Sequence, residues 1–299
     1  MTSSSVPISY MQRTRDYYLA LGYDNPYRWA HYEDVPFARL QKKPLSESKI
    51  AIVTTAAPFQ SDKGDQGPGA PYNAAAKFYQ VYSASTDEDP DLRISHIAID
   101  RDHTTADDIG SYFPLKALKA LAEEGAVGEV APRFFGLPTN RSQRTTLETD
   151  IPQLIDDVLS DQVDAVVLVP NCPVCHQSVS LAARGLEEAN VPTVIMGCAL
   201  DIVEHCGVPR FFFSDFPLGN SAGRPHHPEE QRHGLLMALQ LLETATAPRH
   251  TVQSPYIWAD DHAWKADYSN PDKLTPEDIA KRRAAFDQGK TQAKAIRDG

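Results

Sequence analysis

The feature that most constrains the fold is a series of short, nearly unbroken apolar runs that alternate with segments of helical periodicity. The clearest run is Ala165-Val166-Val167-Leu168-Val169, which Pro170 ends. Strands that are apolar on both faces are typical of a parallel sheet covered by helices on both sides. The pattern therefore predicts an α/β fold, with a mainly parallel sheet in a Rossmann-like three-layer arrangement. Further strands are predicted at residues 49–55, 92–99, 193–196 and 210–213, and helices at 115–124, 148–161 and 175–189.

The chain divides into a core and two terminal arms. We expect an N-terminal helical arm at residues 1–47, an α/β core domain at 48–250 and a charged C-terminal helical tail at 251–299. With 299 residues, the chain has the length of one large domain with extensions. The N-terminal arm is rich in aromatic residues, and we expect it to pack on the core or on a second copy, which would make a homodimer.

Charge and composition exclude several classes of protein. The chain has 29 Lys and Arg residues against 40 Asp and Glu residues, a formal net charge of −11, which argues against a nucleic-acid partner. We find no apolar stretch of the roughly 18 to 20 residues that a membrane helix needs, and no secretory signal at the start, so we expect a cytoplasmic protein without a membrane partner. The four cysteines are too few for a disulfide scaffold.

A pair of thiols provides the strongest chemical signal. Cys172-Pro173-Val174-Cys175-His176 follows the predicted buried strand and begins the predicted helix. The free N–H groups and dipole at a helix N-terminus stabilise a thiolate. We therefore expect Cys172 to act as the nucleophile and Cys175 as the resolving thiol, with an external thioredoxin-like dithiol as reductant and no tightly bound cofactor.

The same residues allow other interpretations. The spacing also fits a haem-attachment motif, although that chemistry belongs to exported proteins. A catalytic metal ion held by Cys172, Cys175 and His103 is a second alternative. A zinc ribbon is disfavoured because Cys198 and Cys206 are seven residues apart. Buried structural cysteines are a third alternative.

Other candidate site residues follow the predicted strands. Because the carboxyl ends of parallel strands share one edge, Cys198 should lie near the thiol pair. His103 and His205 are candidate acids or bases, since imidazole titrates near neutral pH. Candidate substrate-binding residues are Thr55 and Asp215 at strand ends, and Arg133 and Arg210, whose guanidinium groups could hold a carboxylate.

About 250 residues resemble the glycine, sarcosine, betaine and D-proline reductase family, and in particular its selenoprotein B component. The resemblance rests on Tyr17-Tyr18-Leu19-Ala20-Leu21-Gly22-Tyr23, Pro44-Leu45-Ser46-Glu47-Ser48, His103-Thr104-Thr105, Tyr112-Phe113-Pro114-Leu115, Ala131-Pro132-Arg133-Phe134, Cys172-Pro173-Val174-Cys175-His176-Gln177 and Asp201-Ile202-Val203-Glu204-His205-Cys206-Gly207-Val208-Pro209-Arg210.

The resemblance implies an oxidoreductase that works with partner subunits. Reductases of this family use a selenocysteine close to a cysteine to cleave a carbon–nitrogen bond of a small amine. Here Cys172 or Cys175 would stand in that place, and no selenocysteine is present. We therefore expect thiol-dependent reductive cleavage of a bond in another small molecule. The alternatives are a metal-dependent enzyme or metal-binding protein, and a non-catalytic substrate-binding subunit of a reductase complex.

Overall fold

An eight-stranded sheet forms the centre of the protein. The computed structural model describes residues 6–24, 27–40, 43–94, 96, 98–140 and 142–298. The strand order is β10-β9-β8-β7-β1-β6-β3, and β5 also pairs with β1. All pairs are parallel except β3 with β6. The strands are β1 (Lys49–Thr54), β3 (Tyr82–Ser85), β5 (Glu129–Val130), β6 (Arg133–Gly136), β7 (Ala165–Val169), β8 (Thr193–Gly197), β9 (Arg210–Phe213) and β10 (His250–Gln253).

The central strands carry long apolar runs because both faces of the sheet are covered. In β1, Ile50 and Ile52 belong to the core on one face of the sheet, whereas Ala51 and Val53 belong to the core on the other face. Successive side chains of a strand point to opposite faces, so an unbroken apolar run fills both cores.

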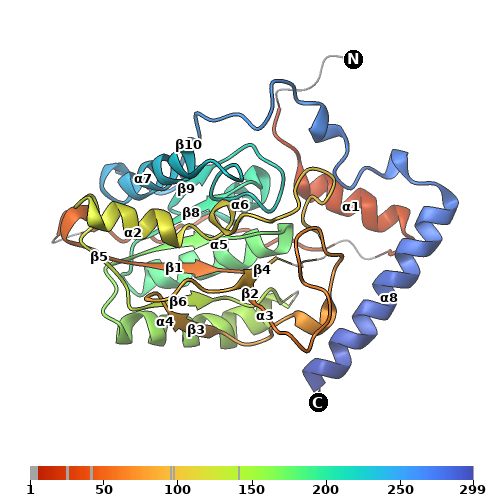
Figure 1. The fold of residues 1–299 in the computed structure, drawn as a ribbon, viewed down its shortest axis with the longest axis horizontal. Coiled ribbons are helices and arrows are strands. Elements are labelled where there is room, and N and C mark those ends of the chain that lie inside the picture. Colours follow the sequence, from red (N-terminus) through yellow and green to blue (C-terminus); the bar gives the residue numbers. More distant parts are fainter. Residues whose placement is uncertain are drawn as a thin grey trace.

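The two cores are closed by helices, which gives three layers (Figure 1). Helices α2 (Leu115–Glu123) and α7 (Pro228–Thr244) pack on one face. Helices α4 (Ile151–Ser160), α5 (Pro173–Glu188) and α6 (Leu200–Cys206) pack on the other face. The predicted three-layer α/β architecture is thus confirmed. The short helix α3 (Gln143–Thr145) and a π turn at Thr146–Asp150 lead into α4.

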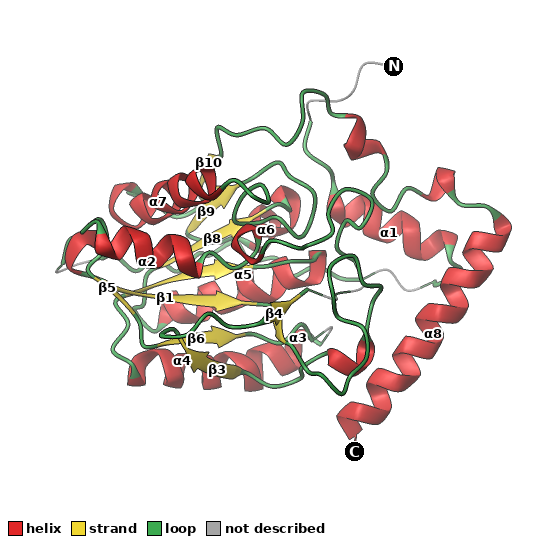
Figure 2. Cartoon of the chain, viewed as in Figure 1, coloured by secondary structure: helices red, strands yellow, loops and turns green. Residues whose placement is uncertain are grey.

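Both terminal segments lie at the carboxyl ends of the parallel strands. In Figure 2 the arrows of β1 and β6 point toward the side where α1 (Tyr10–Ala20) and α8 (Pro276–Asp298) lie. A third apolar cluster joins the termini to the segments that follow β8 and β9. Its members include Ile8, Tyr10, Cys198, Phe216, Trp264 and Tyr268. Short 3-10 turns occur at Leu45–Glu47, Ala74–Ala76, Ile109–Ser111, Ala263–Ala266 and Pro271–Lys273.

The predicted strand at 92–99 is wrong for most of its length. Of this segment, in which residues 95 and 97 lie outside the described residues, only β4 (Leu92–Arg93) is seen as a strand, and it pairs with β2 (Ala57–Pro58) in a separate antiparallel sheet. Ile94 and Ile99 are nevertheless buried in the core that α2 and α7 share. The apolar alternation in this segment therefore reflects burial of an irregular chain, not strand pairing.

The sequence did not predict β3, β6, β10 or α7. The predicted arms contain α1 and α8, but residues 27–40 are irregular, and β10 begins at the predicted end of the core. The division into three segments, the homodimer and the cytoplasmic location stay predictions. Within the part of the chain that is described, no helix combines the length and apolar character needed to cross a membrane.

Candidate functional site

The thiol pair lies where the direction of the chain crossovers changes. Strands β1 and β7 are neighbours paired from Ile50 with Ala165 to Thr54 with Val169. The chain leaves β1 toward α2 on one face of the sheet and leaves β7 into α5 on the other face. In open parallel sheets, such a point opens a crevice outside the carboxyl ends of the strands, where ligands bind.

Both cysteines are held by the first turn of α5. Cys172 is the N-cap residue, and its Sγ accepts a hydrogen bond from the backbone N–H of Cys175 at 3.3 Å. The sulfur atoms of Cys172 and Cys175 are 2.6 Å apart, and both residues are free thiols. Their exposed fractions are 3% and 0%. The predicted pair is therefore assembled, but it is buried.

Cys175 has more hydrogen-bond donors around its sulfur than Cys172 has. The hydroxyl of Thr139 lies 3.1 Å from the Cys175 sulfur, and the His96 imidazole lies beside it. Burial opposes ionisation of Cys175, but the contacts with Cys172, His96 and Thr139 outweigh it and hold its pKa well below the usual value. Burial, and then the neighbouring Cys175, raise the pKa of Cys172. The arrangement places the negative charge of the pair on Cys175.

Thr55 orients the residue that precedes the pair. Its Oγ1 accepts hydrogen bonds from both the backbone N–H and the Nδ2 of Asn171, each at 3.1 Å. Asn171 is fully buried, and its Oδ1 has no hydrogen-bond partner among the described residues. A buried oxygen without a partner is costly, so Asn171 offers a binding position to a ligand with a hydrogen-bond donor.

His176 connects the thiol pair to Cys198. Its Nδ1 donates to the carbonyl oxygen of Cys172 at 2.8 Å, and its Nε2 accepts from the Cys198 N–H at 2.9 Å. The ring is therefore neutral, and burial lowers the pKa of His176 to about 4. A Cβ atom on Gly197 would lie 2.8 Å from this Nε2, which explains the glycine at the end of β8. Cys198 is thus at the predicted edge, but burial raises the pKa of its thiol to about 12.

His103 and Asp215 lie at the same side of the sheet but are engaged in ion pairs. His103 Nδ1 is 3.0 Å from Asp100, and its Nε2 is 3.1 Å from Asp267. Asp215 is 2.5 Å from the ammonium group of Lys265, and this pair is largely buried. The pair joins the segment after β9 to the C-terminal arm. The imidazole beside the thiols is His96, not His103.

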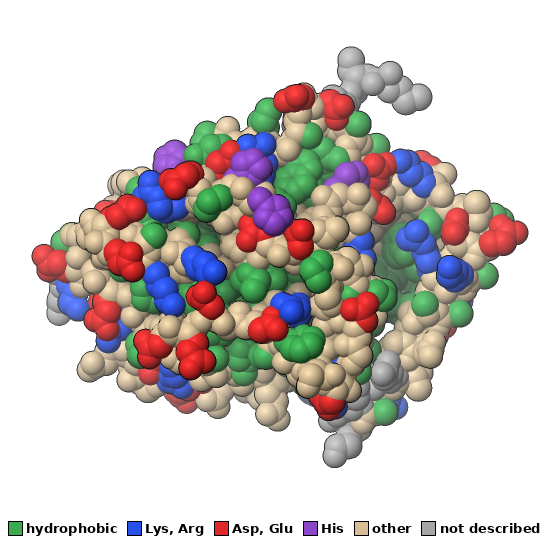
Figure 3. All heavy atoms as spheres, in the orientation of Figure 1, with side chains coloured by type: hydrophobic (Ala, Val, Ile, Leu, Met, Phe, Trp, Pro, Cys, Tyr) green, Lys and Arg blue, Asp and Glu red, His purple; other side chains and the backbone are tan. Residues whose placement is uncertain are grey.

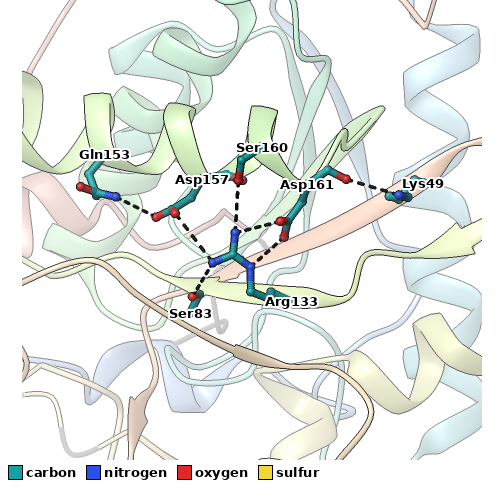
Figure 4. Close-up of polar contacts among 7 residues, drawn as sticks. All are labelled: Lys49, Ser83, Arg133, Gln153, Asp157, Ser160 and Asp161. Atoms are coloured by element: carbon teal, nitrogen blue, oxygen red, sulfur yellow. Dashed lines mark hydrogen bonds and ion pairs between the residues drawn. The ribbon is translucent and has the colours of Figure 1, made fainter.

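The structure does not bring Arg133, Arg210 and His205 to the thiols. Arg133 and Arg210 each begin a strand, so they lie at the amino edge of the sheet, opposite the thiol pair. Figure 4 shows Arg133 held by Ser83, Asp157, Ser160 and Asp161. Both guanidinium groups are bound by carboxylates of the protein and are not available for a substrate carboxylate.

Arg210 and His205 have other buried or surface roles. Arg210 is fully buried and lies 2.9 Å from Glu187. His205 stacks on His31, with ring centroids 4.7 Å apart, and the carbonyl of His205 contacts the same ring. As for the alternative metal site, the described residues contain no group of three or more His, Cys, Asp and Glu side chains placed to hold a metal ion.

The terminal arms cover the site. Tyr10 and Tyr268 are both buried, with ring centroids 5.1 Å apart, and burial raises the pKa of Tyr268. In Figure 3 the surface is hollowed between α8 and the body of the molecule, with hydrophobic side chains inside the hollow. A substrate that reaches the sulfurs therefore requires movement of this cover.

Sequence reasoning missed His96, Thr139 and Asn171. Asn171 could have been found because it precedes Cys172 at the end of the clearest strand. His96 and Thr139 are far from the cysteines in the chain, and their local sequence carries no signal that separates them from other polar loop residues.

Comparison with known proteins identifies three relatives. The chain is 28% identical over 216 residues to the D-proline reductase subunit gamma of Acetoanaerobium sticklandii, which covers 72% of this chain and 86% of that subunit. It is 24% and 22% identical to the glycine reductase complex component B subunit gamma of Symbiobacterium thermophilum and of Peptoclostridium acidaminophilum, over 208 and 220 residues. These matches cover 68% and 72% of this chain but only 48% and 49% of the relatives.

No protein-family model matches the chain, and no solved structure matches it. The names of the three relatives agree with the family expected from the sequence motifs. This agreement comes from sequence comparison and does not depend on the geometry of the site. The matched stretch includes most of this chain and most of the D-proline reductase subunit. The similarity to these subunits of D-proline reductase and of glycine reductase component B therefore supports the reductase family that the sequence motifs indicate.

Proposed function

We propose that this protein is a thiol-dependent reductase subunit that cleaves a bond in a small molecule with the two electrons of the Cys172–Cys175 pair. The single observation that carries the proposal is the 2.6 Å separation of the two reduced sulfurs at the N-terminus of α5. The relatives, which are named as subunits of reductases, support a reductase-related role. Partner subunits are part of the proposal.

The donors around the sulfurs support a different order of attack from the one expected from the sequence. Because Cys175 faces Thr139, His96 and the Cys172 thiol, it carries the charge and is the nucleophile. Its sulfur attacks an activated carbon or sulfur of the substrate, and the leaving group departs with its bonding electrons. Cys172 then attacks the Cys175 sulfur, which forms the disulfide and releases the reduced fragment with the Cys172 proton.

The cycle needs an external reductant. Cleavage transfers two electrons and two protons from the dithiol to the substrate fragments, and a thioredoxin-like dithiol would return them. Asn171 supports substrate binding in this scheme, because its buried Oδ1 adjoins Cys172 in the chain and has no partner among the described residues.

The experiment is an intact-mass measurement on protein purified without air, followed by mild oxidation and then reduction. We expect reversible loss of two hydrogens, with a bridge mapped to Cys172 and Cys175. Cys172→Ser and Cys175→Ser should abolish the loss, whereas Cys206→Ser, which changes a buried cysteine of α6, should retain it.

Other outcomes separate the alternatives. A stoichiometric metal that shields both thiols in the native mass would replace this proposal with a metal site. In a second outcome, the disulfide forms in the wild type, but Cys172→Ser changes neither ligand binding nor turnover of the complex. That result would show a non-catalytic binding subunit. Absence of any reversible bridge between the two residues would refute the dithiol cycle.

A further inference from the structure

Asn171 carries an unpartnered oxygen in the residue that precedes the thiol pair. Its backbone N–H and its Nδ2 both donate to one atom, Thr55 Oγ1, each at 3.1 Å. The side-chain amide is planar, so its Oδ1 points in a different direction from Nδ2. This oxygen is buried without a hydrogen-bond partner among the described residues, and the residue has an exposed fraction of 0%. A buried acceptor of this kind needs a donor, which a ligand would supply.

Hydrogen bonds fix the chain on both sides of Asn171. The carbonyl oxygen of Pro170 accepts a hydrogen bond from Ser221 Oγ at 2.5 Å, and Cys172 Sγ accepts one from the backbone N–H of Cys175 at 3.3 Å. Consecutive Cα atoms lie about 3.8 Å apart, which places Asn171 and the Cys172 sulfur within the span of one small molecule. An acceptor that is already fixed beside a reacting atom can select among substrates, because it need not be ordered on binding.

Uncharged groups hold Asn171 and the two sulfurs. The hydroxyl of Thr55 contacts Asn171, the hydroxyl of Thr139 contacts the Cys175 sulfur, and a backbone N–H contacts the Cys172 sulfur. A substrate carboxylate at this position would lose its hydration and would also meet the negative charge on Cys175. An uncharged N–H group meets neither cost and can donate to Asn171.

We propose that Asn171 is the specificity-determining residue of the site, and that the substrate is an uncharged amide with a leaving group on the carbon next to its carbonyl. This inference rests on the proposed dithiol function. The amide N–H of the substrate donates to Asn171 Oδ1. The amide carbonyl activates the neighbouring carbon for attack by Cys175.

Bonds, electrons and protons balance for such a substrate. The Cys175 thiolate attacks the carbon, and the leaving group departs with the electron pair of its bond and takes up the proton that Cys175 has lost. Cys172 then attacks the Cys175 sulfur, which forms the disulfide and breaks the new carbon–sulfur bond. The electron pair of that bond stays on the carbon, where the carbonyl delocalises it, and the Cys172 proton adds there. The released product is the amide with hydrogen in place of the leaving group.

The test compares three alkylating reagents on the reduced protein: iodoacetamide, its N,N-dimethyl derivative, which has no N–H, and iodoacetate. Loss of the Cys175 thiol is followed by mapped mass, whether the residue ends as an adduct or in the disulfide. Each rate is divided by the rate of the same reagent with free cysteine, which removes differences in intrinsic reactivity. In the wild type, iodoacetamide should exceed each of the other two reagents about fivefold, the factor that one net hydrogen bond contributes.

Variants assign this preference to Asn171. Asn171→Leu removes the acceptor at similar volume, so the preference over the dimethyl reagent should disappear. Asn171→Asp keeps an acceptor and should retain the preference. Gln153→Leu is the control, because it removes an exposed amide of α4 that donates to Asp157, and it should match the wild type. Ratios taken within one protein cancel changes in how often the cover opens and in how much thiolate is present.

The wild-type ratios decide the substrate class without any variant. Absence of a preference for iodoacetamide, or an undiminished preference in folded Asn171→Leu, would overturn the inference. A preference for iodoacetate would show that Asn171 presents its amide N–H groups to an anion, and would overturn it as well. Mild oxidation of the same proteins tests the dithiol function separately: if the disulfide forms while the preference is absent, the proposed function survives and the role of Asn171 does not.

Discussion

Acidification should loosen the junction between β7 and β8 through one buried side chain, His176. Its Nδ1 donates to the Cys172 carbonyl oxygen, and its Nε2 accepts from the Cys198 N–H. A second proton on Nε2 would face an N–H donor and would remove the bond that links the two strand ends. Burial therefore lowers the pKa of His176 from 6.5 to about 4.

The sign and size of the effect follow from proton linkage. In the unfolded chain, the His176 side chain binds a proton below about pH 6.5, whereas the folded protein binds it only below about pH 4. Between these values the unfolded state holds more protons, so the free energy of unfolding falls as the pH falls. At about 1.4 kcal/mol per pH unit, acidification from about pH 6.5 to about pH 4 lowers the free energy of unfolding by about 3 kcal/mol. About 1 kcal/mol of this is lost by about pH 5.5.

The assay is urea unfolding at several values from about pH 7.5 to about pH 4.5, on wild type and His176→Gln. At neutral pH the variant should be less stable by about 1 to 3 kcal/mol, because the polar groups of Cys172 and Cys198 lose their partner. Its stability should then fall less than that of wild type on acidification. His227→Gln removes an exposed histidine and should keep the wild-type dependence. Equal pH dependence in His176→Gln and wild type would refute the reasoning.

Four further substitutions test other parts of the structure. Lys265→Met leaves the mostly buried Asp215 carboxylate unpaired, so the C-terminal cover should open more often. Alkylation of the two thiols, mapped by mass spectrometry, should then accelerate at least tenfold. A tenfold change corresponds to less free energy than the about 3 to 5 kcal/mol that breaking a fully buried pair costs. Lys273→Met removes a more exposed pair with Asp267 and should leave that rate unchanged; equal rates in both variants would contradict a cover held by Lys265. Arg210→Met should lower the free energy of unfolding by about 3 to 5 kcal/mol in urea, because Glu187 would remain buried without its partner, and a loss below about 1 kcal/mol would count against that role. Arg133→Met should cost less than about 1 kcal/mol and leave disulfide formation unchanged, since this half-exposed group lies at the other edge of the sheet; a changed disulfide rate would show that it acts on the site.

The parts of the fold that were predicted share one physical property, which is burial on both faces. In β1, β7, β8 and β9 the apolar residues alternate between the two cores, so the apolar run marks the strand directly. Strand β6 has only two apolar residues, Phe134 and Phe135, between Arg133 and Gly136, and β3 is an antiparallel edge strand with exposed Ser83 and Ser85, so neither has a longer apolar run. Their pairing depends on tertiary contact. A Cβ atom on Gly136 would lie 1.8 Å from the Tyr82 ring, a requirement that only the folded pair reveals.

In the candidate site, too, the features that are local in the sequence were predicted, and the contacts between distant segments were not. The thiol pair was predictable because a strand end, an N-cap and one helical turn are all local in the sequence. The partner His96 was not predictable, because its contact with Cys175 joins segments almost eighty residues apart. The sequence indicated His103 as a candidate acid or base instead, and the structure pairs that imidazole with the carboxylates of Asp100 and Asp267.

The order of the two thiols shows why helix position alone does not decide reactivity. The helix argument favours a charge on Cys172, because the N-cap sulfur receives a backbone N–H, and the structure contains that bond at 3.3 Å. In a pair only 2.6 Å apart, however, one proton is shared, and the charge settles on the sulfur with more donors. Cys172 has one backbone donor, while Cys175 has the Cys172 thiol, the Thr139 hydroxyl and the His96 imidazole. Side chains supplied by distant segments therefore reverse the order that the helix alone would set.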